Sequence, residues 1–366
     1  MNEFIPSWTY YYDLKKNRKE YLEIINKVFD SGRLLFGKEL ENLERNFSKY
    51  IGTKYAIGCD NATNGIFLSL KTIGLSPGDI VITVANTAIP TVSAIKQAGA
   101  TPKFVDVNKH ALLDKKNLIK VINKKVKAII PVHLYGFPCN MKEICEVAKE
   151  FQIPVIEDCS QAHGSKINTQ KVGSFGDLSV FSFYPTKSLG GFGDAGIVCT
   201  NNPKFRDKLN RLRFYGIKEN YIADIEGYNS RMDEIHAGIL NAKLKRLDEN
   251  ISYRNKIRGI YKKEISNRKL RLIPKPEACS ISNYLIPFLY DGDRDEFQQK
   301  LFNRGIGTNV SYRTPIYSMP AYKNLNCNKE HFPNTEDFCK KNISLPIFDY
   351  IPIELVEKTI EIINKI

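Results

Sequence analysis

Short apolar runs alternate with amphipathic stretches from about residue 54 to residue 200. The amphipathic stretches have the spacing of helices, and the apolar runs have the length and β-branched content of strands. This alternation predicts an α/β fold with a mostly parallel sheet and covering helices. Because the runs are continuously apolar, we expect the sheet to be buried on both faces. The strands are expected at 54–58, 79–84, 101–107, 126–132, 153–158, 178–183 and 196–200, and the helices at 62–74, 89–99, 116–125 and 141–151.

The pattern changes in the second half of the chain. From Arg231 to about Lys263 the hydrophobic spacing is that of long helices. After Ser280 a second mixed set of strands and helices is expected, at 283–290, 295–305, 306–312 and 355–366. We therefore expect two domains: a large one over 1–250, which includes an N-terminal helical segment, and a smaller C-terminal α+β domain over 251–366.

Composition narrows the class of protein. The 366 residues suffice for a sizeable core, and no internal repeat is visible. No apolar run approaches the roughly 18 residues of a membrane helix, and the N-terminal residues lack the features of a secretory signal. The cysteines, at 59, 139, 145, 159, 199, 279, 327 and 339, form no CxxC pair and have no metal-ligand spacing. We expect a cytoplasmic protein with no membrane contact, disulfide framework or metal.

The chain is basic, with 54 Lys and Arg residues against 40 Asp and Glu residues and a formal charge of +14. This excess permits an anionic ligand such as nucleic acid, a membrane surface or a nucleotide sugar. Many of the lysines, however, lie on the faces of predicted helices, where charged side chains more often interact with water than recognise a ligand. A nucleic-acid binder would need a basic stripe with interleaved aromatics or a known binding module, and neither is found. We therefore expect no nucleic-acid partner.

Reactive side chains follow several of the predicted strands. In open α/β sheets, ligands bind outside the carboxyl ends of the strands. A carboxylate, a lysine and a small hydroxyl-bearing turn at neighbouring strand ends together form a coherent pyridoxal phosphate (PLP) site. The residues at these positions are Asn61, Ala62 and Thr63 after the first strand, Asp158, Gln161 and His163 after the fifth, and Ser182, Tyr184 and Lys187 at the end of the sixth or just after it.

PLP chemistry needs these residue types. A fixed carboxylate keeps the pyridinium nitrogen protonated, and Asp158 suits this role. Lysine forms Schiff bases with carbonyls, because its ammonium loses a proton readily when desolvated. Lys187 therefore suits the covalent attachment, and its freed amine would then move a proton between substrate and cofactor.

The cofactor phosphate needs several hydrogen-bond donors that take up little space. The turn from Asn61 to Thr63 precedes a helical pattern, so it offers backbone amides at a helix N-terminus and the Thr63 hydroxyl. Ser182 adds a second hydroxyl. The glycine-rich segment 188–196 lets the backbone approach the cofactor closely, although such turns occur in any α/β protein.

Each of these residues also has a structural interpretation. An Asp after a strand is more often a helix cap, and a single lysine is usually a surface residue. His133 and His163 are as readily hydrogen-bonded structural histidines as participants in the chemistry. It is the joint arrangement of Lys187, Asp158 and the Asn61 turn that favours a cofactor site.

The sequence resembles the DegT/DnrJ/StrS sugar aminotransferases, fold-type I PLP enzymes related to aspartate aminotransferase. The resemblance runs essentially end to end. Its most specific segments are EDCSQAHGS at 157–165, SFGDLSVFSFYPTKSLGGFGDAG at 174–196 and GYNSRMDEIHAGIL at 227–240. It implies a mainly parallel seven-stranded sheet in the large domain, with a smaller C-terminal domain.

The resemblance also implies roles for individual residues. Lys187 would be the residue that carries PLP, Asp158 would pair with the ring nitrogen, and Gln161 would contact the ring hydroxyl. Ala62, Thr63 and Ser182 would hold the phosphate. Asn229 and Arg231 would complete the site of a neighbouring subunit, which requires a homodimer. The candidate substrate contacts are His163, Tyr184, Arg231 and Tyr312.

Two positions depart from the family pattern. Many members carry an aromatic residue that stacks on the cofactor ring where this chain has Ala88. With the smaller alanine, either another residue covers this face of the ring or the face is more open. The phosphate turn reads Asn-Ala-Thr instead of Asn-Gly-Thr, and Ala62 can still donate its amide if its φ is negative.

The resemblance predicts transfer of an amino group from L-glutamate to a nucleotide-linked keto-deoxysugar, with 2-oxoglutarate as co-product. The segment GYNSRMDE at 227–234 is similar to members that act on dTDP-3-keto-6-deoxyhexoses, and a 4-keto sugar is an alternative. A PLP-dependent sugar dehydratase is a second alternative, which the presence of Lys187 disfavours because such relatives carry histidine there. A non-catalytic regulatory protein is a third, although it would not need Lys187, Asp158 and Gln161 together.

Overall fold

The structure is a computed structural model that describes residues 4–366. Seven of its described strands form one central sheet. Four are hydrogen-bonded in the order β1-β9-β8-β5 and three in the order β3-β2-β4. Parallel bridges from Ile129 to Val155 and from Val132 to Asp158 join β4 to β5. The strands are β1 (Tyr55–Cys59), β2 (Ile80–Val84), β3 (Thr101–Val105), β4 (Val126–Ile129), β5 (Ile156–Asp158), β8 (Leu178–Ser182) and β9 (Gly196–Thr200).

The sheet is mainly parallel. Only β9, among these strands of the described chain, runs antiparallel to its neighbours, β1 and β8. The pairs β5 with β8, β2 with β3 and β2 with β4 are parallel. The predicted α/β class and mainly parallel seven-stranded sheet are confirmed. Because these strands are parallel, the carboxyl ends of β2, β4, β5 and β8 lie at the same edge of the sheet, where a ligand can bind.

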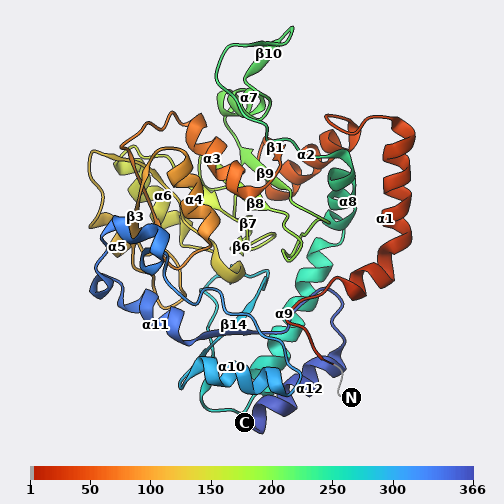
Figure 1. Ribbon diagram of the computed structural model, residues 1–366, viewed down its shortest axis with the longest axis vertical. Helices are drawn as coiled ribbons and strands as arrows, with labels where there is room; N and C mark the ends of the chain where they lie inside the picture. The colour runs from red at the N-terminus through yellow and green to blue at the C-terminus, as the bar shows by residue number, and fades with distance from the viewer. Residues whose placement is uncertain (1–3) are drawn as a thin grey trace.

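Helices cover both faces of the sheet (Figure 1). Alternate residues of β9 face opposite sides, as a strand requires. Val198 packs with side chains of α3 (Ala62–Thr72), α4 (Ile89–Gln97) and α7 (Pro203–Leu212). Ile197 and Cys199 pack with side chains of α2 (Lys38–Ile51) and α8 (Glu234–Leu244). All five residues of β8 and of β9 are buried, which explains why these strands carry no charged side chain.

One predicted helix is shorter than expected. The pattern at 116–125 predicts a helix throughout, but α5 spans only Lys115–Ile119. The chain then turns at Asn123, whose side chain accepts a hydrogen bond from the amide of Lys125 at 2.9 Å. This turn is needed because β4 begins at Val126, so the tertiary connection overrides the helical pattern. On the other side of β4, α6 (Met141–Glu150) forms as predicted.

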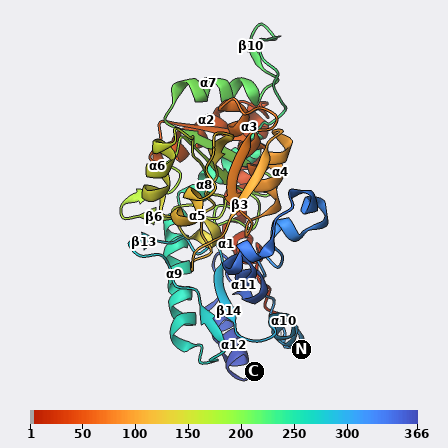
Figure 2. The same ribbon diagram turned by 90° about the vertical axis from the view of Figure 1, so that its left-hand side faces the viewer.

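The C-terminal part forms a smaller α+β unit at one end of the molecule (Figures 1 and 2). The long helix α9 (Leu247–Glu264) leads into it. Its sheet has the antiparallel order β12-β14-β15, and its core also contains Ile5 from the start of the chain. The domain boundary near residue 250 stays a prediction. The remaining elements of this unit are β12 (Leu270–Leu272), β14 (Ile286–Tyr290), β15 (Asn342–Leu345), α10 (Arg294–Asn303), α11 (Pro333–Lys341) and α12 (Ile353–Asn364).

Several further elements complete the described part of the chain. The hairpin of β10 (Ile217–Glu219) and β11 (Ile222–Ala223) projects from the end opposite the C-terminal unit (Figure 1). At its turn Tyr221 is 82% exposed. None of the helices in residues 4–366 has the length and apolarity needed to cross a membrane. The other elements are α1 (Tyr11–Ser31), β6 (Lys166–Ile167), β7 (Gln170–Lys171), β13 (Cys279–Ser280) and the 3₁₀ turns Leu134–Gly136, Ile316–Ser318, Pro320–Leu325 and Lys329–His331.

Candidate active site

A cavity of about 540 Å³ opens at the sheet edge where β5 and β8 end and α3 begins. It brings together most of the residues that the sequence singles out. Eight of the predicted site residues line it, from three separate segments of the chain: Asn61, Ala62, Thr63, Asp158, Gln161, Ser182, Tyr184 and Lys187.

Lys187 lies in the turn after β8. Its backbone amide donates to the carbonyl of Tyr184 at 2.9 Å, and its Nζ lies 4.7 Å from the centre of the Tyr284 ring. Within residues 4–366 its amine makes no hydrogen bond or ion pair. The turn is tight, because a Cβ added at Gly190 would lie 2.2 Å from the carbonyl oxygen of Pro185. The lysine is therefore held by its backbone while its amine is available for chemistry.

Asp158 is the last residue of β5, and its side chain is almost fully buried. Its Oδ1 accepts a hydrogen bond from the amide of Ser160 at 3.1 Å. Its Oδ2 accepts one from the hydroxyl of Thr91 at 2.8 Å. Sequence reasoning missed Thr91. The available signal is that Thr91 lies in the first turn of α4, the helix that follows β2, and therefore near the sheet edge where β5 ends.

The turn predicted to hold phosphate forms the N-terminus of α3. Asn61 caps the helix, and its side chain accepts from the amide of Asn64 at 2.9 Å. The amides of Ala62 and Thr63 are thus first-turn donors without intrahelical acceptors. Ala62 is helical and has no positive φ, so the alanine in place of glycine leaves this amide able to donate. A Cβ added at Gly196 would lie 2.8 Å from the amide nitrogen of Ala62, which requires glycine there.

Gln161 has a fixed orientation. Its Oε1 accepts from the backbone amide of Tyr135 at 2.8 Å, and its Nε2 donates to the hydroxyl of Tyr312 at 2.9 Å. An amide nitrogen carries two protons, so Nε2 retains one for a ligand in the cavity. Tyr312 does not itself line the cavity. Its position behind Gln161 was not evident from the sequence, because the two residues are 151 positions apart.

His163 does not line the cavity. Its fully buried ring lies 5.4 Å from the ring of Phe181 and 5.8 Å from that of Phe183, and neither ring nitrogen has a partner in good hydrogen-bond geometry within residues 4–366. Burial, and then the nearby charge of Lys187, lower the pKa of His163 to about 3. At neutral pH its ring is therefore uncharged and packs as part of the core behind the site.

Asn229 and Arg231 lie away from the cavity of their own chain. The Asn229 side chain is exposed, while its backbone bridges to Phe214. The guanidinium of Arg231 lies 5.7 Å from the Phe214 ring and 5.5 Å from the Tyr215 ring. Ala88, the other position singled out by the sequence, does line the cavity, at the residue before α4.

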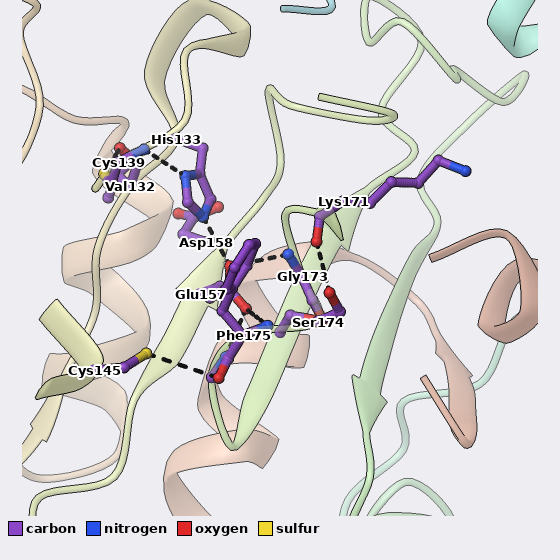
Figure 3. A network of polar contacts seen from close by, with 12 residues as sticks. Val132, His133, Cys139, Cys145, Glu157, Asp158, Lys171, Gly173, Ser174 and Phe175 are labelled. Carbon is purple, nitrogen blue, oxygen red and sulfur yellow. Dashed lines mark hydrogen bonds and ion pairs between the residues drawn. The ribbon is translucent and has the colours of Figure 1, made fainter. Parts of the chain in front are cut away.

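A buried polar network lies behind Asp158 (Figure 3). Glu157 accepts hydrogen bonds at both oxygens: from the amide of Gly173 at 2.9 Å and the His133 ring at 3.1 Å on Oε2, and from the amides of Phe175 and Gly176 at 2.8 Å each on Oε1. The His133 Nδ1 accepts the amide of Cys139 at 3.0 Å. His133, Glu157 and Cys159 are close enough to be considered as metal ligands. However, hydrogen bonds already occupy the Glu157 oxygens and both His133 nitrogens, so we interpret this group as structural.

The sequence matches the model of the DegT/DnrJ/EryC1/StrS aminotransferase family over residues 15–364. This chain belongs to that family. A relative from Micromonospora megalomicea subsp. nigra named dTDP-3-amino-3,4,6-trideoxy-alpha-D-glucose transaminase is 35% identical over 98% of each chain. Other relatives carry names of the same kind. Proteins named as regulatory or sensory proteins are also similar.

Solved structures of the DegT/DnrJ/EryC1/StrS family have the same fold. The crystal structure of DesV from S. venezuelae in complex with a ketimine intermediate has a TM-score of 0.96 and 32% identity, with 100% of this chain and 98% of DesV covered. NtdA from Bacillus subtilis, solved with bound cofactor PMP, has a TM-score of 0.86 and 26% identity, covering 95% and 82% of the two chains. Another neighbour was solved in a PLP form.

The chain is therefore an aminotransferase of this family, whose cofactor is pyridoxal phosphate. The donor set of the cavity fits that group. An unpaired amine at Lys187, a buried carboxylate at Asp158 and free amides at the start of α3 line one cavity, and each matches a different part of the cofactor.

Proposed function

We propose that this protein transfers an amino group from L-glutamate to a nucleotide-linked keto-deoxysugar, with PLP attached to Lys187. The observation that carries the proposal is the placement of Lys187 and Asp158 on one cavity, with the lysine amine free of any ion pair within residues 4–366. When bound, PLP supplies an electron sink for negative charge on the reacting carbon.

The side chains around the cavity divide the work. Asp158 holds a proton at the ring nitrogen, because its carboxylate favours the charged form of that nitrogen. Lys187 moves a proton between the substrate carbon and the cofactor carbon as general base and then acid. Gln161 donates its remaining Nε2 proton to the ring hydroxyl oxygen.

The start of α3 would hold the phosphate of the cofactor. The free amides of Ala62 and Thr63 would donate to it, and the helix dipole would favour its negative charge there. The hydroxyls of Thr63 and Ser182 add two donors at the same cavity. Ser182 already accepts from the amide of Tyr184 at 3.2 Å, so its hydroxyl proton is free to be donated.

The substrate we favour is a dTDP-linked 3-keto-6-deoxyhexose. Its support is the segment 227–234 and the similarity to relatives named as dTDP-3-amino sugar transaminases. Tyr184 lines the cavity and is 51% exposed, so it lies where a sugar would enter. A 4-keto sugar is the alternative.

We further propose a homodimer in which Asn229 and Arg231 complete the cavity of the partner subunit. The exposed Asn229 side chain and the projecting hairpin 217–223 support this arrangement. Mixing Lys187→Ala and Asn229→Ala subunits tests it. In a random mixture about half of the dimers contain one subunit of each kind. If the site is shared, one of the two sites in each mixed dimer is intact, so about a quarter of all sites regain activity. No recovery on mixing would contradict the shared site.

Borohydride reduction followed by peptide mapping tests the covalent attachment. We expect the label on Lys187 and none in Lys187→Ala, while the exposed Lys204→Ala on α7 keeps the label as a matched control. A label on another lysine would overturn the proposal.

A panel of dTDP-, UDP- and GDP-keto sugars with L-glutamate, read by mass spectrometry, tests the reaction. An amino sugar as product supports transamination. A dehydrated sugar without nitrogen identifies a dehydratase, and the absence of any glutamate response identifies a regulatory protein.

A further inference from the structure

Thr91 lies in the first turn of α4, and its side chain is 1% exposed. Its hydroxyl lies 2.8 Å from Oδ2 of Asp158 and 3.1 Å from the hydroxyl of Thr87. Thr87 is also buried, and all three residues line the cavity. The three side chains therefore form a short chain of polar contacts from the α4 N-terminus to the carboxylate.

The number of hydroxyl protons decides which group donates and which accepts in each of these contacts. An ionised carboxylate has no proton to donate, so the single hydroxyl proton of Thr91 points to Asp158. The Thr87 hydroxyl must then donate to the oxygen of Thr91. Donation by Thr87 polarises the Thr91 hydroxyl and strengthens its bond to the carboxylate. With the carboxylate as acceptor, both hydroxyl protons point towards Asp158.

The carboxylate is fixed at both oxygens. Thr91 donates to Oδ2, and the amide of Ser160 donates to Oδ1 at 3.1 Å. A carboxylate has about four acceptor positions, so positions remain for the cofactor. The N-terminus of α4, a nine-residue helix, adds positive potential near the same group. Other titratable groups around Asp158 are Tyr312, Cys159, Lys187 and Asp194.

We propose that Thr91 is a positioning residue, which aims the Asp158 carboxylate at the ring nitrogen of the cofactor. This inference rests on the proposed function. Without the hydroxyl, the carboxylate is held at one oxygen only and is less well aimed, so it favours the charged form of the ring nitrogen less. The ring then carries less positive charge and is a weaker electron sink.

Two substitutions separate the hydroxyl from the shape of the side chain. Thr91→Val keeps the shape and removes the donor, whereas Thr91→Ser keeps the donor. For Thr91→Val we expect PLP to bind the apoenzyme roughly 10-fold more weakly and kcat to fall roughly 10- to 100-fold, with a smaller change in KM for glutamate. Thr91→Ser is expected to stay within about threefold of the parent protein.

The absorbance of the bound cofactor gives a readout that a merely structural role does not move. The pH midpoint for the nitrogen that links Lys187 to the cofactor is expected to rise in Thr91→Val, because a less positive ring withdraws less charge from it. Thr72→Val is the matched control. It removes a buried hydroxyl that has no partner within residues 4–366 and does not line the cavity, and its midpoint should equal that of the parent.

The inference is overturned if Thr91→Val has the parent's midpoint and PLP affinity while borohydride still labels Lys187. If Thr91→Val does not fold, Thr87→Val is the second test. Thr87 donates to Thr91, so its loss should also raise the pH midpoint, by less than the loss of Thr91 would. No rise in that variant overturns the inference. Failure to label Lys187 in the parent protein is a different result, which contradicts the proposed function itself.

Discussion

Gln161 donates a hydrogen bond from Nε2 to the hydroxyl of Tyr312 at 2.9 Å, across 151 positions of sequence. Gln161 lines the cavity, whereas Tyr312 belongs to the segment between α10 and α11. The amide of Tyr135 fixes the other end of the Gln161 side chain. The C-terminal part of the chain therefore sets the orientation of a side chain at the cofactor cavity.

Tyr312→Phe tests this coupling. Loss of one neutral hydrogen bond costs about 1 kcal/mol, so we expect PLP affinity for the apoenzyme to fall roughly fivefold. Fluorescence titration with PLP measures it. Tyr317→Phe is the matched control, because its hydroxyl donates to Glu336, and neither residue lines the cavity. Equal affinities of Tyr312→Phe and the parent would show that Gln161 needs no support from Tyr312.

Gly196→Ala is expected to damage phosphate binding. The added Cβ would lie 2.6 Å from the carbonyl carbon of Asn61 and 2.8 Å from the amide nitrogen of Ala62, so the turn at the start of α3 must move. We expect at least a roughly 10-fold loss of PLP affinity, equivalent to about 1.4 kcal/mol. Gly259→Ala in α9 meets no atom within 4 Å and should stabilise that helix by up to about 1 kcal/mol without changing PLP affinity. Unchanged affinity in Gly196→Ala would contradict the close approach.

The stability of the protein should depend on His163 below neutral pH. Burial lowers the pKa of His163 from 6.5 to about 3, so the unfolded state takes up a proton that the folded state refuses. This makes the contribution of His163 to stability complete above pH 6.5, and it is lost as pH falls from 6.5 towards 3. In His163→Leu, the free energy of unfolding between pH 6 and 4 should change less steeply, by up to about 1.4 kcal/mol per pH unit.

Urea unfolding at pH 7, 6, 5 and 4 measures this slope for His163→Leu. The exposed His331→Gln is its control and should retain the slope of the parent protein. If His163→Leu and the parent protein have the same slope, the ring of His163 takes up its proton in the folded state as readily as in the unfolded state.

Lys243→Met is expected to destabilise the protein strongly. Lys243 and Asp13 form a buried ion pair with 3.2 Å between Nζ and Oδ2, and Tyr21 donates to the same carboxylate. Removal of the lysine leaves a buried charge without its counter-ion, which costs about 3–5 kcal/mol in urea unfolding. Lys300→Met breaks the exposed pair with Glu296 and should cost far less, because solvent screens that pair. Similar losses of unfolding free energy in Lys243→Met and Lys300→Met would contradict the role of Lys243 as the buried counter-ion of Asp13.

The strands of the large sheet could be predicted from the sequence because burial on both faces leaves mostly apolar runs. The runs that contain β8 and β9 illustrate this, since all five residues of each strand are buried. The strand-end rule likewise pointed to Lys187 and Asp158, which do line one cavity. The helix at 116–125 was predicted too long, because its end depends on where β4 must start.

The sequence by itself determined which segments are buried and which reactive groups follow the strands, because these properties depend on neighbours along the chain. Only the tertiary structure decided that Thr91 donates to Asp158, that Tyr312 orients Gln161 and that His163 packs between two phenylalanines. Each of these contacts joins residues from separate elements. Its distance is set by how the strands and helices pack, and no local pattern of hydrophobic and polar residues carries that information.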